Sequence, residues 1–278
     1  MLHLTPSLTR STLATLIRGA IPVIAAVGAL GLLGSCTGER PSLGPAVVTA
    51  STGSTSTPAS SSTSAPTGKT TLGPDSLLGY IATPTGKPVV HVEPKDDSLT
   101  LDLPAKTGAG APTTFAVVGN PTGDGDGWIQ VLLPTRPNGT TAWVPVASVA
   151  ITKTDLQIFV DLSARLLTVK KASSEVLASK IAIGDTVNPT PVGATYLTEL
   201  IDNNEPAGPY GPYAFGLALH SDTLSEFGGG DGQVGIHGTN QPKLIGQAVS
   251  HGCVRLTNGD VKKLVGLSLP LGAPVFIS

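Results

Sequence analysis

Glycine and proline interrupt this chain so often that long helices are excluded. The 278 residues include 34 glycines and 24 prolines, and both residue types disfavour helix interiors and favour turns. Charged residues make up 13% of the chain, well below the usual ~25%, which also argues against coiled coils and charged tails. A formal net charge of −2 gives no electrostatic case for nucleic-acid binding, which needs a clustered basic face. The pattern predicts short strands joined by turns.

The N-terminus has the pattern of an export signal. Arg10 and Arg18 precede an uncharged apolar run over residues 20–33, and a positive flank before such a run is typical of secretory signals. The run is shorter than the ~18 residues expected of a membrane-spanning helix, and it ends in LGSC, which resembles the bacterial lipobox. We therefore expect residues 1–36 to be a lipoprotein signal peptide with Cys36 lipidated at the outer face of the cytoplasmic membrane. The alternative, an uncleaved membrane anchor, also places the rest of the chain outside the cytoplasm.

Two segments are expected between this signal and the C-terminal part. Residues 37–74 are rich in Ser, Thr and Pro, so they bury too little apolar surface to offset ordering entropy and are predicted to be a disordered linker. In residues 75–151, two apolar runs (128–133 and 141–146) flank an Asn-Gly turn at Asn138, a strong hairpin signal. This pattern resembles bacterial SH3-like domains, which implies a small β-barrel that binds cell-wall material or supports the next domain. A packed spacer is the alternative.

The remaining segment, residues 152–278, keeps the β pattern. Apolar runs over 156–160 and 166–169 flank a polar turn and predict a hairpin. One helix is expected near the C-terminus, with Asn258 as its cap and its end before Gly266. The sequence therefore predicts a mainly β chain with one or two short helices.

A cysteine and two histidines near the C-terminus give the main chemical signal. Cys253 is the only thiol after the predicted signal peptide, and an unpaired cysteine in an oxidising compartment is a liability unless its reactivity is used. An imidazole from His237 or His251 can hold such a thiol as a thiolate in an ion pair. Gly252 allows a tight turn in which backbone N–H groups point at a developing oxyanion. These residues predict a Cys/His acyl-transfer site.

Other interpretations of the same residues stay open. His237, His251, Cys253 and His220 are residue types that zinc accepts, although no carboxylate or second thiol lies at tight spacing. A lone cysteine is most often a buried, unreactive thiol, although the polar, glycine-rich residues around Cys253 argue against burial here. The residues alone also allow a general cysteine peptidase.

The stretch SHGCVR over residues 250–255 resembles the signature of L,D-transpeptidases with a YkuD-type catalytic domain. An upstream histidine is found where this family has one, at His237. Further similarity lies in residues 190–193 and 211–216, and the resemblance covers roughly residues 154–278. The order of lipobox, linker and SH3-like module also resembles actinobacterial members. The resemblance implies a β-sandwich-like catalytic fold whose site faces peptidoglycan.

The resemblance also implies a role for each matching residue. Cys253 would be the nucleophile and His237 the general base, with the carbonyl of Gly238 orienting the imidazole. Many relatives have Ser at the position of Gly238. His251 would tune or position the thiolate, and the backbone N–H groups of Gly252 and Cys253 would form the oxyanion hole.

Substrate contacts are implied for a second group of residues. The fixed positive charge of Arg255 suits a stem-peptide carboxylate such as that of diaminopimelate. Ser250 and Tyr213 lie within the matching motifs, and Gly232 and Gln233 end the glycine-rich loop just before the general base.

The expected function is that of an exported, lipid-anchored L,D-transpeptidase. Its thiol would attack the third residue of a tetrapeptide stem, expel D-Ala, and pass the acyl group to a diaminopimelate amine on a second stem, giving a 3→3 cross-link. No metal or cofactor is required, no nucleic acid is expected as a partner, and carbapenems would acylate the thiol. The alternatives are an L,D-carboxypeptidase that uses water in the second step, a non-catalytic wall-binding lipoprotein, and a metalloprotein.

Overall fold

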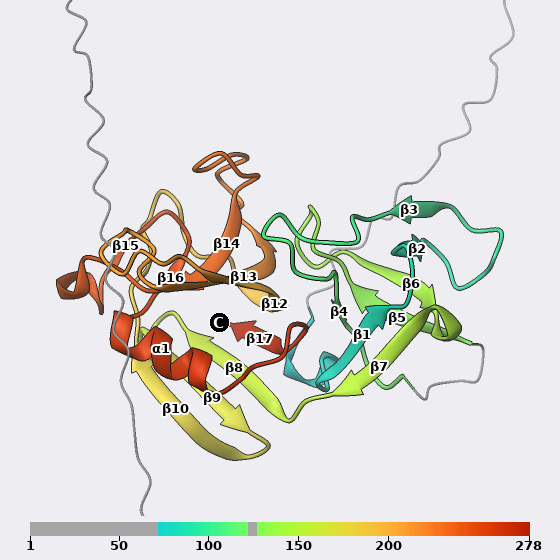
Figure 1. Cartoon of the computed structure of the whole chain (residues 1–278), viewed down its shortest axis with the longest axis horizontal. Coiled ribbons are helices and arrows are strands. Elements are labelled where there is room, and N and C mark those ends of the chain that lie inside the picture. The colour runs from blue at the N-terminus through green and yellow to red at the C-terminus, as the bar shows by residue number, and fades with distance from the viewer. Residues whose placement is uncertain (1–71, 122–126) are drawn as a thin grey trace, which may run out of the picture. The chain divides into compact units, whose positions relative to one another are not determined.

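The computed structural model describes residues 72–121 and 127–278, which are coloured in Figure 1. The predicted signal peptide, its Cys36 and the linker up to residue 71 lie outside the described residues. No helix among the described residues has the length and apolar character needed to cross a bilayer.

Strands dominate the described residues, so the mainly β fold class is confirmed. In chain order, the strands are β1 (Tyr80–Pro84), β2 (Val89–His91), β3 (Thr100–Asp102), β4 (Phe115–Ala116), β5 (Trp128–Leu132), β6 (Thr141–Pro145), β7 (Val149–Lys153), β8 (Leu156–Asp161), β9 (Leu166–Lys171), β10 (Ser174–Lys180), β11 (Ile183–Gly184), β12 (Gly193–Asp202), β13 (Tyr213–His220), β14 (Gln233–His237), β15 (Ala248–Ser250), β16 (Val254–Arg255) and β17 (Pro274–Ile277). The helical elements of the described residues are η1 (Pro74–Ser76), η2 (Val146–Ser148), η3 (Pro242–Leu244) and α1 (Asn258–Gly266).

Strands β1 to β7 form an N-terminal module of two small sheets. Their orders are β4-β1-β7 and β3-β2-β6-β5. The predicted hairpin is confirmed, because β5 and β6 pair antiparallel with Ile129 opposite Val144. Both residues are buried while their neighbours along each strand are more exposed, as expected when one face of a hairpin packs on a core. Whether this module is SH3-like stays a prediction.

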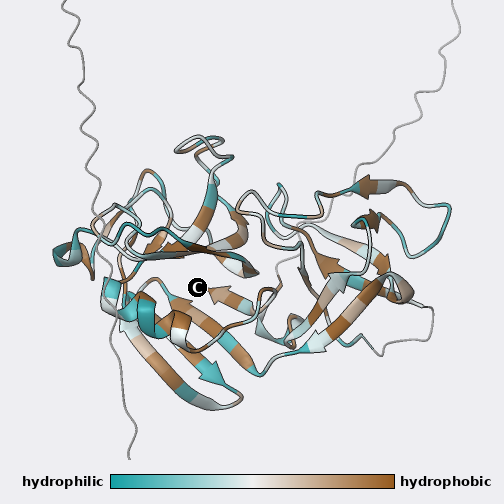
Figure 2. Ribbon diagram, viewed as in Figure 1, coloured by the Kyte–Doolittle hydropathy of each residue, from teal (hydrophilic) through white to brown (hydrophobic). Residues whose placement is uncertain are grey.

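The C-terminal part is built on a sheet whose eight described strands run in the order β10-β9-β8-β17-β12-β13-β14-β16. The hairpin predicted from the sequence is its β8–β9 pair. Ile158 and Leu167 at one end of this sheet belong to the same buried cluster as Phe215, Ile236 and Val254 near the other end. The sheet therefore curls around one core (Figure 1), and Figure 2 shows hydrophobic bands along β8, β9 and β13. This arrangement agrees with the predicted sandwich-like fold class.

Helix α1 packs on this core, and its N-cap is Thr257 and not Asn258 as predicted from the sequence. The side chain of Thr257 accepts a hydrogen bond from the backbone N–H of Asp260 at 3.1 Å, so Thr257 is the N-cap. The side chain of Asn258 is used elsewhere, because its Oδ1 accepts from the N–H of Thr239 at 2.9 Å. The helix also includes Gly266, one residue more than expected.

A further apolar cluster joins the module to the large sheet. Its buried members come from the module and from β12, β13 and β17: Leu72, Leu77, Ala116, Leu132, Ala194, Tyr196, Ala218 and Phe276. Burial of apolar surface is the main favourable contribution to such packing. The two parts are therefore held against each other by a shared core.

Candidate active site

Strands β14 and β16 bring the predicted nucleophile and base to one face of the sheet. The strands pair in parallel, with Ile236 beside Val254 and His237 beside Arg255. Ile236 and Val254 are fully buried in the core, and alternate residues of a strand point to opposite faces. His237, Arg255 and Cys253 therefore project from the other face. The strand spacing and rise separate the backbones of Cys253 and His237 by about 8 Å, within reach of the two side chains.

A backbone carbonyl fixes the tautomer of His237. The Nδ1 atom lies 2.6 Å from the carbonyl oxygen of Gly238, which is the contact that the resemblance implies. A carbonyl oxygen only accepts hydrogen bonds, so Nδ1 holds the proton and Nε2 keeps its lone pair. Burial lowers the pKa of His237 to about 4, aided by the charge of Arg255 and opposed by the Gly238 hydrogen bond. The ring is therefore a neutral base near neutral pH.

Burial has the opposite effect on the thiol. Desolvation raises the pKa of Cys253 above its ordinary value, against a hydrogen bond from the backbone N–H of Gly235 and the charge of Arg255. Loss of water disfavours the charged form of both groups. Both pKa shifts therefore favour a neutral thiol and a neutral imidazole over a thiolate–imidazolium pair.

Ser250 shapes the turn that presents the thiol. Its hydroxyl donates to the carbonyl of Cys253 at 2.6 Å and accepts from the N–H of Gly252 at 3.2 Å. Gly252 has φ +115, which a residue with a side chain rarely adopts. Ser250 is fully buried and stabilises this turn, and its contact with substrate stays a prediction. The N–H of Gly252 bonds within the turn, and the oxyanion hole stays a prediction.

Two aromatic rings cover the histidines of the site. The ring of His251 stacks on Phe227, with centroids 5.0 Å apart and an interplanar angle of 29°. Tyr210 packs edge-on against His237, with centroids 4.9 Å apart. Sequence reasoning missed Tyr210, whose only signal is an aromatic residue in a loop rich in glycine and proline. Tyr213, which was expected to contact substrate, packs against the hydrophobic core instead.

Phe227 belongs to a tight turn in the loop between β13 and β14. The N–H groups of Phe227 and Gly230 each donate to the other's carbonyl at 3.0 Å. Gly228 and Gly229 between them have φ +61 and φ +87, the positive values that a type I′ turn requires. The turn places an aromatic ring over His251, beside the nucleophile.

The base of this loop is held by the Asn-Gly turn of the N-terminal module. The Arg136 guanidinium donates to the carbonyls of Ser221 at 2.6 Å and of Leu224 and Asp231, each at 2.9 Å. A Cβ on Gly232 would overlap the Leu224 carbonyl oxygen and lie 2.9 Å from this guanidinium, at a φ of +78. Gly232 therefore makes room for the Leu224 carbonyl and Arg136, and its contact with substrate stays a prediction.

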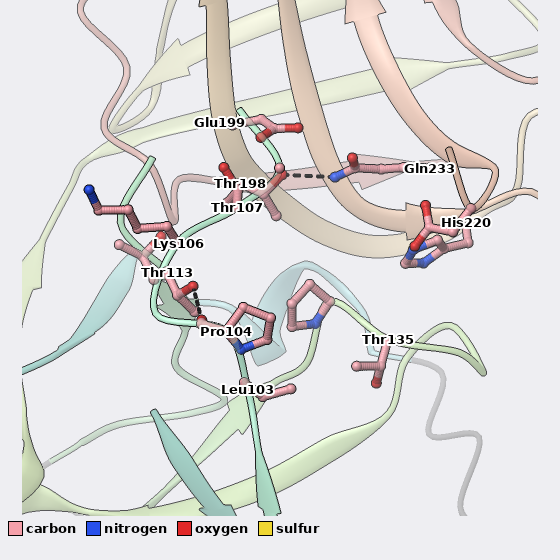
Figure 3. Close-up of a pocket in the computed structure, with 14 residues that line it drawn as sticks. Leu103, Pro104, Lys106, Thr107, Thr113, Thr135, Thr198, Glu199, His220 and Gln233 are labelled. Carbon is pink, nitrogen blue, oxygen red and sulfur yellow. Dashed lines mark hydrogen bonds and ion pairs between the residues drawn. The ribbon is translucent and has the colours of Figure 1, made fainter. Parts of the chain in front are cut away.

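Gln233 also lies away from the thiol. Its Nε2 donates to Thr198 Oγ1 at 3.0 Å and to the carbonyl of Leu217 at 2.9 Å (Figure 3). It lines a cavity between the module and the sheet together with Glu199. Gln233 therefore lies beside this cavity, and its contact with substrate stays a prediction.

Close packing explains the glycine after the general base. A Cβ on Gly238 would lie 2.5 Å from Asn258 Oδ1 and 3.1 Å from Pro212 Cδ. Asn258 Oδ1 is fixed there by the N–H of Thr239, so it positions the segment whose carbonyl orients His237. From the sequence, Asn258 was predicted only as a helix cap. Its contact with Thr239 could not be predicted, because the two residues lie far apart in the chain.

The residues weighed as metal ligands do not gather. Across the described ranges, no group of three His, Cys, Asp or Glu side chains lies close enough to hold a metal ion. His220 Nε2 pairs with Asp231 Oδ2 at 3.1 Å, while His251 stacks on Phe227. Arg255 lies on the same face as the thiol, and its buried Nε has no hydrogen-bond partner. Its contact with a substrate carboxylate stays a prediction.

Solved structures of similar proteins include one named as an L,D-transpeptidase. An L,D-transpeptidase from Mycobacterium smegmatis is 14% identical, and the match covers 59% of this chain and 90% of that chain with a TM-score of 0.37. Bd1075 from Bdellovibrio bacteriovorus is 26% identical over 45% of this chain and 48% of that chain, with a TM-score of 0.36.

The C-terminal part is similar in sequence to curated proteins. YkuD of Bacillus subtilis, named as an L,D-transpeptidase, is 35% identical over 121 residues, which are 44% of this chain and 65% of that protein. Its namesake in Bacillus licheniformis is 34% identical over 122 residues, with the same coverage. The match thus spans less than two thirds of these relatives. The family model for the YkuD L,D-transpeptidase catalytic domain matches residues 155–277, so this part of the chain is similar to that family.

Proposed function

We propose that this protein is a peptidoglycan L,D-transpeptidase that works through a thioester on Cys253. The observation that supports this most directly is the shared face of β14 and β16. His237 lies there beside Arg255, Cys253 precedes Arg255 by two residues, and Nδ1 of His237 is bound to the Gly238 carbonyl. Nε2 is then the free base of the site. Similarity of residues 155–277 to the L,D-transpeptidase catalytic domain supports peptidoglycan stem peptides as the substrates.

In the first half-reaction, the Cys253 sulfur attacks the carbonyl carbon of the third residue of a tetrapeptide stem. His237 Nε2 takes the thiol proton as the carbon–sulfur bond forms, which is the role of a general base. The Gly238 carbonyl stabilises the resulting imidazolium through Nδ1. Nε2 then gives the proton to the amine of D-Ala as the peptide bond breaks, leaving a thioester and free D-Ala.

In the second half-reaction, the amine of a second stem attacks the thioester carbonyl. Neutral His237 takes a proton from this amine and passes it to the departing sulfur, so the thiol is restored and a 3→3 cross-link forms. Water in place of the amine gives the L,D-carboxypeptidase reaction. The proposal places this chemistry outside the cytoplasmic membrane, with the chain anchored through a lipidated Cys36.

Incubation with a purified disaccharide tetrapeptide tests the function. Mass spectrometry should detect D-Ala and a cross-linked dimer with the unmodified protein and neither with Cys253→Ala. D-Ala with free tripeptide and no dimer would identify a carboxypeptidase. Absence of D-Ala with a folded protein, together with no imipenem adduct, would favour a non-catalytic wall-binding protein.

A further inference from the structure

A cavity of about 250 Å³ lies between the N-terminal module and the large sheet (Figure 3). Thr198, Glu199 and Gln233 line it from the sheet, and Pro104 and Thr107 are among the residues that line it from the module. Polar side chains that converge on an open cavity are typical of ligand sites.

Glu199 is the unusual member of this lining. The residue is only 6% exposed, and the hydrogen bond that reaches its carboxylate comes from the backbone N–H of Ala109 at 3.3 Å. Lys106 lines the same cavity, but no ion pair in the described part of the chain includes Glu199. A buried carboxylate is costly unless a cation accompanies it. The cavity therefore favours a positively charged group from a ligand.

A strip of glycines connects this carboxylate to the thiol. Glu199 on β12 lies opposite Gly216 on β13, which lies opposite Gly235 on β14. The N–H of Gly235 bonds to the Cys253 sulfur. A Cβ on Gly216 would lie 2.8 Å from Glu199 Oε1, so the Glu199 side chain lies over this glycine.

The geometry of the strip sets the size of the group that fits. Residues directly opposite in neighbouring strands point to the same face, and strands are about 4.8 Å apart. The backbones of Cys253 and Glu199 are therefore three spacings, about 14 Å, apart. Because the Glu199 side chain lies over Gly216, the thiol and the carboxylate are about two spacings, or about 10 Å, apart, and the row between them has only glycines. A long, unbranched side chain can lie across such a surface.

We propose that Glu199 binds the side-chain ammonium of the third residue of the donor stem, the residue whose carbonyl Cys253 attacks. This inference rests on the proposed function, because it takes the substrate from it. An acyl carbon at the thiol places the side chain of the same residue within reach of the glycine strip. A diamino acid of lysine or diaminopimelate length ends in an ammonium group there, and the buried carboxylate binds it in a charge-assisted hydrogen bond.

Binding to the Cys253→Ala variant tests this inference without turnover. The probes are two disaccharide tetrapeptides with diaminopimelate as third residue, one with a free side-chain amine and one with that amine acetylated. Titration calorimetry should give a Kd about 10- to 100-fold lower for the free amine, the range for a hydrogen bond to a charged group. Adding Glu199→Gln should remove this difference, because glutamine still accepts from Ala109 N–H but has no charge.

Matched variants exclude indirect effects. Glu175→Gln removes a charge from the exposed edge strand β10 and should leave the ratio of the two Kd values unchanged. Glu199→Asp keeps the charge and should retain part of the discrimination. Equal Kd values for the two stems, or a ratio that survives Glu199→Gln, would overturn the inference. Release of D-Ala by the unmodified protein is measured separately, so failure of the proposed function is distinguished from failure of this inference.

Discussion

Acid should destabilise this protein through His237, the proposed general base. The pKa of His237 is about 4 in the folded protein, against an ordinary 6.5. Between these pH values the unfolded chain binds a proton that the folded chain excludes, so the free energy of unfolding falls as the pH is lowered. At about 1.4 kcal/mol per pKa unit, His237 alone should remove about 3 kcal/mol between pH 7 and pH 4. This is a large part of the ~5–15 kcal/mol stability of a typical protein.

The test compares urea unfolding of the unmodified protein and His237→Gln at pH 7 and pH 4. The glutamine variant has no group that titrates at this position, so it should lose about 3 kcal/mol less than the unmodified protein. His251→Gln, a change at an exposed histidine, should follow the unmodified protein. Equal losses in the unmodified protein and His237→Gln would refute a depressed pKa, and with it the neutral resting pair.

Three further results are expected. The rate of iodoacetamide alkylation of Cys253 should keep rising above pH 9, because burial raises the pKa of the thiol; a plateau by about pH 7 would instead indicate an ion pair. Asn258→Ala should lower kcat/KM for D-Ala release about 10-fold or more by loosening the Gly238 segment, and unchanged turnover would contradict this positioning role. Arg136→Ala should make residues 221–232 the first site of limited proteolysis, because three backbone carbonyls lose their hydrogen-bond donor. An unaltered cleavage pattern would show that Arg136 does not stabilise this loop.

The parts of the fold that depend on neighbouring residues could be predicted from the sequence. The β5–β6 and β8–β9 hairpins follow from apolar runs around short polar turns. The order of the large sheet could not be predicted, since β17 pairs in parallel with β8 from the far end of the chain, with Val275 beside Ile158. Packing of the N-terminal module on the large sheet could not be predicted from the sequence either. The shared cluster joins residues such as Leu132 and Tyr196, which lie far apart in the chain.

The same distinction holds for the site. The motif around Cys253 and the upstream His237 could be identified from the sequence, because both residues lie in short, recognisable stretches. Their pKa shifts could not be predicted, since burial depends on the whole fold. Asn258 and Tyr210 were missed for that reason too, as their contacts with the His237 segment are made only after folding.

The central claim is that Cys253 forms a covalent acyl-enzyme with the help of His237, and intact-protein mass spectrometry tests it most directly. The protein is mixed with a tetrapeptide donor, without an acceptor stem, and quenched in acid within the first turnover. The account predicts a mass increase equal to the stem without D-Ala, located on the peptide that contains Cys253, much slower to form in His237→Gln and absent in Cys253→Ala. D-Ala release at the normal rate from Cys253→Ala, or an adduct on another residue, would contradict it.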